Sequence, residues 1–123
     1  LFGRRDKRIG REDMMNAVES DVEKLVQKEL ESANQKFPMF RSDHEGAAVI
    51  LEEIEEAHSE MLDMELNYKS LWQTIKENFI NTASYAELIF DDAINLACEA
   101  IQVAAMAQKF IDSQKEREKS EDN

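Results

Sequence analysis

Carboxylate side chains in two separate stretches of the chain have the types and spacing that could hold a metal ion. In the first stretch, Glu52, Glu53 and Glu56 follow one another closely. On a helix, Glu53 and Glu56 lie one turn apart, so their carboxylates can share one hard cation. Mg²⁺ is the usual choice, because it takes oxygen ligands and keeps several waters. A run of glutamates on a helix is equally typical of a solvated face, so this stretch alone does not decide.

The second stretch carries polar groups on one side of an otherwise apolar helix: Asp92, Asn95, Glu99 and Gln102. Glu99 stands just ahead of the run IQVAAMA, so we expect it to be buried. An unpaired carboxylate there is unfavourable or takes up a proton. The closest basic residue along this helix is Lys109, nearly three turns away, so a cation shared with Glu53 and Glu56 is one solution. The other is a Glu99 that is neutral or hydrogen-bonded to Tyr85, Trp72 or Gln102.

The elements that must position these groups are helices. The chain has few turn-forming residues, with 3 glycines and 1 proline, and its apolar residues recur at three- and four-residue spacing. This pattern predicts helices over 12–34, 42–67 and 83–114, with 68–80 either a separate helix or a bent continuation of the second. Ser42 can cap the second helix, and Glu45 can reach back to the Ser42 amide. We therefore predict an all-α fold, a bundle of about four helices.

At 100° per residue, the second helix separates into two faces. One face collects apolar residues: Ala47, Ile50, Leu51, Ile54, Met61 and Leu62. The opposite face collects acidic residues: Glu45, Glu52, Glu56, Glu60 and Asp63. Glu53 lies at the boundary between the two. Such an acidic stripe repels itself unless water or a cation compensates it.

The chain divides into three parts. Residues 1–11 are predicted to be a loose basic lead-in, 12–112 a single helical domain, and 113–123 a charged tail that frays. A break between the last two helices is expected near 81–84, where NTAS offers cap and turn residues. The helix over 83–114 is apolar around much of its circumference, which is typical of a central helix or one shared between subunits. We therefore expect a homodimer or homotetramer.

The net charge and the single cysteine limit which ligands the protein can bind and which cellular environment suits it. The formal net charge of -12 argues against unaided binding to nucleic acid or to an anionic membrane surface, which needs patches of lysine and arginine. No apolar run approaches the roughly 18 residues that span a bilayer. The single cysteine, Cys98, cannot form an internal disulfide and is expected to be a buried thiol, so we predict a reducing, cytoplasmic environment.

The two acidic motifs resemble those of the MazG-like all-alpha nucleotide pyrophosphohydrolases, whose signature is EExxE followed downstream by ExxD. Here the corresponding residues are Glu52-Glu53-x-x-Glu56 and Glu99-x-x-Gln102. The flanking segments HEGAAVILEEIEE and EAIQVAAMAQKFI look closer still to small MazG-like proteins of phage and prophage. The resemblance covers about residues 37–111. It implies an oligomeric helical bundle and Mg²⁺-dependent hydrolysis of a nucleoside triphosphate to the monophosphate and pyrophosphate, with Mn²⁺ as a substitute ion.

Carried over by position, the resemblance implies the metal ligands Glu53, Glu56, Glu99 and Gln102. Glu52 or Glu56 would act as the base that activates water. Further residues would contact the substrate: Lys69, Lys76 and Lys109 its phosphates, and Trp72 or Tyr68 its base. Ordinary core packing is the alternative for Trp72.

One residue departs from the family pattern. Gln102 replaces the final aspartate, which removes a negative charge from the site and weakens its hold on a second ion. Asp92, earlier on the same side of the helix, is a candidate to compensate for this lost charge and to contact the substrate. The alternative function is a catalytically silent, acidic helical bundle that acts as an interaction or structural module.

Overall fold

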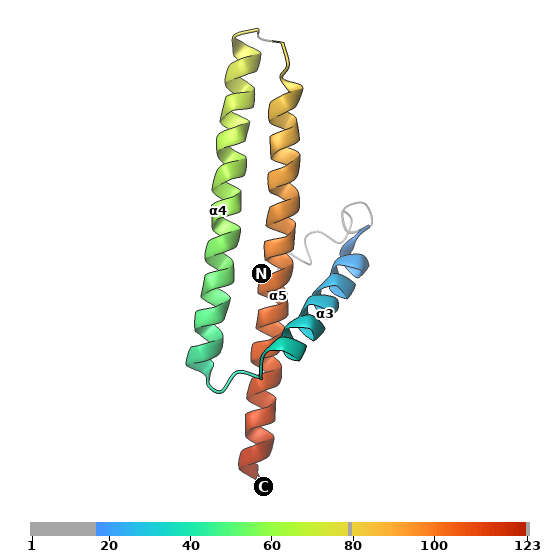
Figure 1. Cartoon of the computed structure of the whole chain (residues 1–123), viewed down its shortest axis with the longest axis vertical. Coiled ribbons are helices and arrows are strands. Elements are labelled where there is room, and N and C mark those ends of the chain that lie inside the picture. The colour runs from blue at the N-terminus through green and yellow to red at the C-terminus, as the bar shows by residue number, and fades with distance from the viewer. Residues whose placement is uncertain (1–16, 79, 123) are drawn as a thin grey trace, which may run out of the picture.

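The computed structural model describes residues 17–78 and 80–122, which form three α-helices and no strand (Figure 1). They are α3 (Glu19–Lys36), α4 (Asp43–Lys76) and α5 (Ala83–Asp122). The all-α prediction is confirmed, whereas the described residues do not form the predicted bundle of about four helices. The lead-in at 1–11 and the start of the first predicted helix at 12–16 lie outside the described residues.

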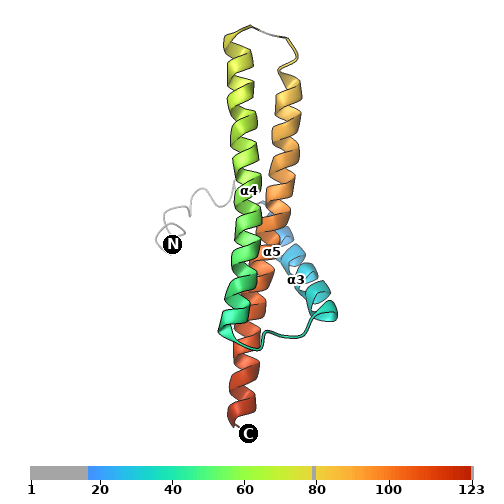
Figure 2. The ribbon, with the colours of Figure 1, turned by 60° about the vertical axis from the view of Figure 1, so that its left-hand side comes forward.

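Helices α4 and α5 run antiparallel and lie side by side in both views of the ribbon (Figures 1 and 2). Helix α4 is continuous over 34 residues, because nothing between Asp63 and Lys69 breaks a helix. Residues 68–76 therefore continue the second predicted helix. In the turn that follows, Asn78 and Asn81 have φ values of 57° and 72°, a left-handed conformation that asparagine tolerates better than most residues. This turn confirms the break expected near residues 81–84.

The start of α4 is fixed by its cap. The Ser42 hydroxyl oxygen accepts a hydrogen bond from the Glu45 backbone N–H at 3.1 Å, as predicted. The Glu45 carboxylate does not return to the Ser42 amide. It accepts instead from Nε of Arg41, at 3.4 Å, so this half of the capping prediction is wrong.

A coiled-coil-like seam joins α4 to α5. Buried and half-buried side chains of α4 recur at alternating spacings of four and three: Gly46, Ile50, Glu53, Ala57, Glu60, Met64, Asn67, Leu71 and Thr74. The matching positions on α5 are Tyr85, Ile89, Asp92, Leu96, Glu99, Val103, Met106, Phe110, Ser113 and Arg117. On each helix, one of the two heptad positions that form the seam is occupied by polar residues over several heptads. These are Glu53, Glu60, Asn67 and Thr74 on α4, and Tyr85, Asp92 and Glu99 on α5. The seam therefore places carboxylates and amides between the two helices.

Helix α3 packs on α5 and not on α4, and both views show it crossing the C-terminal half of α5 (Figures 1 and 2). The buried core lies at this crossing and comprises Leu30, Phe40, Ala105 and Met106. Gly46 lets α4 come close to the same region, because a Cβ there would lie 2.6 Å from Cδ2 of Phe110. This end of the molecule is therefore packed tightly, while an opening remains between α3 and α4.

The prediction of a frayed tail at 113–123 is wrong, since α5 continues to Asp122. Ser113 is 1% exposed, and its hydroxyl oxygen accepts a hydrogen bond from the Phe40 backbone N–H at 2.9 Å. Arg117 donates to the Phe40 carbonyl oxygen at 2.8 Å and also pairs with Asp43. These contacts with the 37–42 connection hold the last turns of α5 in helical form.

The outer faces of the hairpin carry many exposed apolar side chains, among them several from the apolar face of the second predicted helix. They include Leu51, Ile54, Leu62 and Leu66 on α4 and Leu88, Phe90, Ile94 and Ile111 on α5. Cys98 is exposed as well, so the expectation of a buried thiol is wrong. Among the described residues, no helix is long and apolar enough to cross a membrane.

Candidate functional site

Three carboxylates meet across the α4–α5 seam. Helix α4 supplies Glu53 and Glu56, one turn apart, and α5 supplies Glu99 from the opposite side. One carboxylate oxygen from each lies within 4.8 Å of those of the other two. The structure thus brings together the acidic residues that the two sequence motifs contributed. Oxygen atoms this close can bind a single hard cation.

The electrostatics of the site oppose three negative charges in the absence of a cation. Burial raises the pKa of Glu53 above its ordinary value, and the charges of Glu56, Glu52 and Glu29 raise it further. Each of these causes disfavours the ionised form of Glu53. A bound cation would reverse the balance, because it stabilises the carboxylate form.

The pKa of Glu99 is raised as well, chiefly by burial and next by a side-chain hydrogen bond with Glu56. The charges of Glu56, Glu53 and Glu60 contribute in the same direction. None of the ion pairs among the described residues includes Glu99. The partner of Glu99 is therefore a second carboxyl group rather than Tyr85, Trp72 or a lysine.

Two carboxylate oxygens in the cluster are left without a hydrogen-bond donor. Within residues 17–78 and 80–122, Oε2 of Glu53 and Oε2 of Glu99 are buried and make no hydrogen bond. A buried acceptor without a partner is unfavourable. These atoms are suited to a proton or to a cation.

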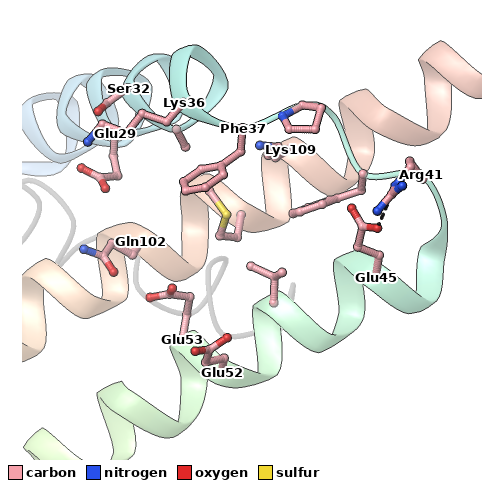
Figure 3. A pocket seen from close by; sticks show the side chains of 15 residues that line it. Glu29, Ser32, Lys36, Phe37, Arg41, Glu45, Glu52, Glu53, Gln102 and Lys109 are labelled. Atoms are coloured by element: carbon pink, nitrogen blue, oxygen red, sulfur yellow. Dashed lines mark hydrogen bonds and ion pairs between the residues drawn. The ribbon is translucent and has the colours of Figure 1, made fainter.

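Gln102 and Glu52 lie beside the cluster on the wall of a pocket between α3 and α4 (Figure 3). Figure 3 shows Gln102 of α5 and Glu53 of α4 on facing sides of the same end of the pocket. Glu52 is exposed to solvent next to Glu53. The pocket therefore reaches the carboxylate cluster at one end, which gives a ligand of that pocket access to an ion held there.

Asp92 does not join the cluster. It lies two turns before Glu99 on α5, and its Oδ2 accepts a hydrogen bond from the side-chain amide of Asn67 at 2.6 Å. Asp92 therefore forms a separate polar contact across the seam, with Asn67 as its partner. The charge lost at Gln102 is therefore not replaced by Asp92 within this chain.

Trp72 and Lys76 lie at the opposite end of α4 from its capped start. Trp72 follows Glu56 by sixteen residues, roughly 24 Å along the helix. Trp72 is 51% exposed, so it is not part of a core within this chain, and Lys76 is exposed at the last helical position. The chain does not bring either residue to the three carboxylates.

Glu60 is a neighbour of the site that the sequence pattern missed. It is half-buried in the seam, one heptad after Glu53, and its charge raises the pKa of Glu99. At 100° per residue, the sequence pattern assigned Glu60 to the acidic face of the helix. A period of 3.5 residues would have revealed it, because Glu53, Glu60 and Asn67 are each seven residues apart.

Comparison of the chain with protein-family models, with curated proteins and with solved structures finds no match. The chemistry of the site therefore follows from its own geometry. That geometry is a carboxylate triad with two unpaired oxygens, at the end of a pocket.

Proposed function

We propose that the protein is a Mg²⁺-dependent nucleoside triphosphate pyrophosphohydrolase that releases the monophosphate and pyrophosphate. The observation that supports this proposal is the meeting of Glu53, Glu56 and Glu99 within 4.8 Å across two helices. The resemblance of the two motifs to the MazG-like enzymes supplies the reaction. An acidic chain can bind a polyanionic nucleotide only if cations offset the repulsion, which a metal site provides.

The donor set favours Mg²⁺, with Mn²⁺ as a substitute. All the donors are oxygen atoms, with the Gln102 amide as a neutral addition, and the two unpaired Oε2 atoms suit a hard cation. When bound, such an ion neutralises charge that builds on phosphate oxygens. Glu53, Glu56 and Glu99 would hold it from the two sides of the seam.

Glu52 is the residue that we assign as general base. It is exposed on the pocket wall, adjacent to Glu53, whereas Glu56 is engaged with Glu99. Its carboxylate would accept a proton from the attacking water as the new P–O bond forms. The bond between the α- and β-phosphates breaks, and pyrophosphate leaves.

A second copy of the chain is part of this proposal. The exposed apolar side chains on α4 and α5 form a surface that water solvates poorly. Packing two hairpins together would cover it and produce a four-helix bundle from two α4–α5 pairs. We therefore propose a homodimer or homotetramer that works in the cytoplasm.

The test is a panel of ribo- and deoxyribonucleoside triphosphates assayed for pyrophosphate release with Mg²⁺. We expect release from at least one nucleotide, and a loss of roughly a hundredfold or more in Glu53→Gln and Glu99→Gln. Glu55→Gln, which alters an exposed glutamate of α4 outside the cluster, is the matched control. No release from any nucleotide would contradict the proposal.

The alternative is a catalytically silent interaction module. Gln102 favours it by leaving the site one carboxylate short, and the exposed apolar face suits a partner protein. A silent module has no reason to gather three carboxylates without a counter-ion, because their repulsion destabilises the fold. A protein that folds and oligomerises but neither binds Mg²⁺ nor releases pyrophosphate would support this alternative.

A further inference from the structure

The pocket between α3 and α4 has a volume of about 630 Å³ and joins two chemically different ends (Figure 3). At one end lie the acidic residues Glu52 and Glu53. The rest of the wall combines apolar and polar side chains. The apolar ones are Ala33, Phe37, Pro38, Phe40, Val49 and Met106, and the polar ones are Glu29, Ser32, Lys36, Arg41, Glu45, Gln102 and Lys109. A volume of this size is typical of sites that enclose a small organic ligand.

Lys109 is the unusual residue of this wall. It lines the pocket, yet the residue as a whole is only 2% exposed. Among the described residues it takes part in no hydrogen bond and no ion pair. Its contact is with an aromatic face, since Nζ lies 5.2 Å from the centre of the Phe40 ring. Burial lowers its pKa, and the charge of Glu45 opposes that shift.

An ammonium group has three N–H donors and no acceptor. Burying it without an acceptor is unfavourable, and an aromatic face offsets only part of that loss. The contact with Phe40 is not needed to hold the connection on α5, because Ser113 and Arg117 already bond its backbone. The donors of Lys109 are therefore available to a ligand in the pocket.

We infer that the pocket receives a nucleobase and that Lys109 selects bases carrying a keto oxygen, by donating a hydrogen bond to it. The keto bases are guanine, hypoxanthine, uracil and thymine. Adenine and cytosine present an amino group at the equivalent position, which would face Lys109 as donor against donor. The inference rests on the proposed function for its ligand class, and it adds a preference among nucleotides.

Position along α5 favours the base over the phosphates as the group that meets Lys109. Lys109 follows Gln102 by seven residues, roughly 10 Å along the helix, so it lies at the other end of the pocket from Glu53. The Phe40 ring lies against Nζ of Lys109, and Phe37 lines the same pocket, so aromatic faces are present to stack on a planar ring. Phosphates belong at the carboxylate end, where a cation can bind them.

Uncharged nucleosides test base recognition separately from metal binding and hydrolysis. The probes are two pairs, inosine against adenosine and uridine against cytidine, titrated by protein-observed NMR without metal. Within each pair the main difference is an oxygen against an amino group. We expect the keto member to bind about tenfold more tightly in each pair, as a hydrogen bond from a charged donor provides. Equal affinities within both pairs, or no binding of any nucleoside, would overturn the inference.

Variants separate recognition from a structural role. Lys109→Met keeps the length of the side chain, and we expect it to lose about tenfold toward inosine and uridine while leaving adenosine and cytidine unchanged. Lys109→Gln offers both a donor and an acceptor, so it should make the affinities for the two nucleosides of each pair more nearly equal. It replaces the methionine variant if that variant does not fold. Lys115→Met removes an exposed charge from the same helix and should keep the preference. Equal weakening of all four nucleosides by Lys109→Met would show a purely structural role.

Hydrolysis tests the enzymatic activity separately from base recognition. Rates with ITP against ATP, and with UTP against CTP, should follow the nucleoside preference. If the nucleosides discriminate and no triphosphate is hydrolysed, the inference stands and the proposed function fails. If hydrolysis occurs without any keto preference, the proposed function stands and the inference fails.

Discussion

Glu56 of α4 and Glu99 of α5 face each other across the seam of the hairpin, and one carboxylate oxygen of each lies within 4.8 Å of the other. Two carboxylates this close repel each other, and either a proton or a cation relieves the repulsion. Burial and the neighbouring carboxyl groups raise the pKa of Glu99, so the protonated form of Glu99 is more favoured than that of an ordinary glutamate. Proton and metal compete for the same oxygens, and several measurable consequences depend on that competition.

The first concerns pH and the metal-free protein. The pKa values of Glu53 and Glu99 are raised above the ordinary value of 4.5, so folding favours their protonated forms. Their contribution to stability is complete below about pH 4.5 and is lost as pH rises through the raised values. We expect Glu99→Gln to flatten this part of the profile and to be more stable than wild type at pH 8.

Urea denaturation from pH 4.5 to 8 without metal measures the effect. Glu87→Gln, at an exposed position earlier on α5, is the control. A wild-type free energy of unfolding that depends on pH in the same way as that of Glu99→Gln would contradict the expectation.

The second concerns metal binding. Mg²⁺ or Mn²⁺ should raise the melting temperature at pH 8, since a ligand at about 100 times its Kd adds about 2.7 kcal/mol. For a domain of this size, that amounts to a shift of roughly 10 °C. Glu53→Gln and Glu99→Gln should abolish the shift, and Glu55→Gln should retain it. A wild-type melting temperature that does not respond to either ion would remove the main support for the proposed hydrolase activity.

The third concerns Gln102, which lines the same pocket as Glu53. Gln102→Glu preserves the shape of the side chain and adds a carboxylate. Without metal it should lower the melting temperature through repulsion, and with metal it should tighten Mg²⁺ binding by about tenfold. Calorimetric titration of Mg²⁺ measures the affinity, with Gln35→Glu on the exposed side of α3 as the matched charge control. An unchanged affinity would place Gln102 outside the metal site.

The fourth concerns the end of α5. Ser113→Ala removes the acceptor for the buried N–H of Phe40 and should lower the free energy of unfolding by about 1–3 kcal/mol. Ser120→Ala, at an exposed position on the same helix, should change it by less than about 0.5 kcal/mol. Urea denaturation of both variants provides the comparison, and equal stabilities would show that the contact is dispensable.

The fifth concerns assembly. Leu66 is 60% exposed on α4, and a glutamate there should prevent two apolar faces from packing together. Sedimentation velocity should show wild type as a dimer or tetramer and Leu66→Glu as a smaller species with unchanged helical content. Glu65→Gln serves as the neighbouring control. A monomeric wild type at micromolar concentrations would contradict the assembly.

Local patterns in the sequence predicted the helices and the three site carboxylates. These signals depend only on residues that are close together in the sequence, so they can be recognised without knowing the tertiary structure. They are the helical periodicity, the Ser42 cap and the NTAS turn. Glu99 was recognisable because a carboxylate in apolar surroundings needs a partner. The spacing of Glu53 and Glu56 on a helix supplied the other two groups of the site.

Contacts between distant segments could not be predicted in the same way. The C-terminal residues are helical because Ser113 and Arg117 meet the connection at Phe40, more than seventy residues away. Their composition alone indicated a solvated tail. Glu60 was assigned to the solvent-facing side because a period of 3.6 residues describes a single helix. The packing of α4 against α5 follows a period of 3.5 residues, which places Glu60 in the seam.

The hydrogen bond between Asn67 and Asp92 also bears on how the triad is assembled. A hairpin joined only by interchangeable apolar layers can slide by one heptad and keep its packing, whereas a polar layer loses its partner when it slides. Asn67 lies eleven residues beyond Glu56, and Asp92 lies seven before Glu99. The Asn67–Asp92 hydrogen bond therefore favours one register of α4 against α5, and that register is the one in which Glu53, Glu56 and Glu99 meet.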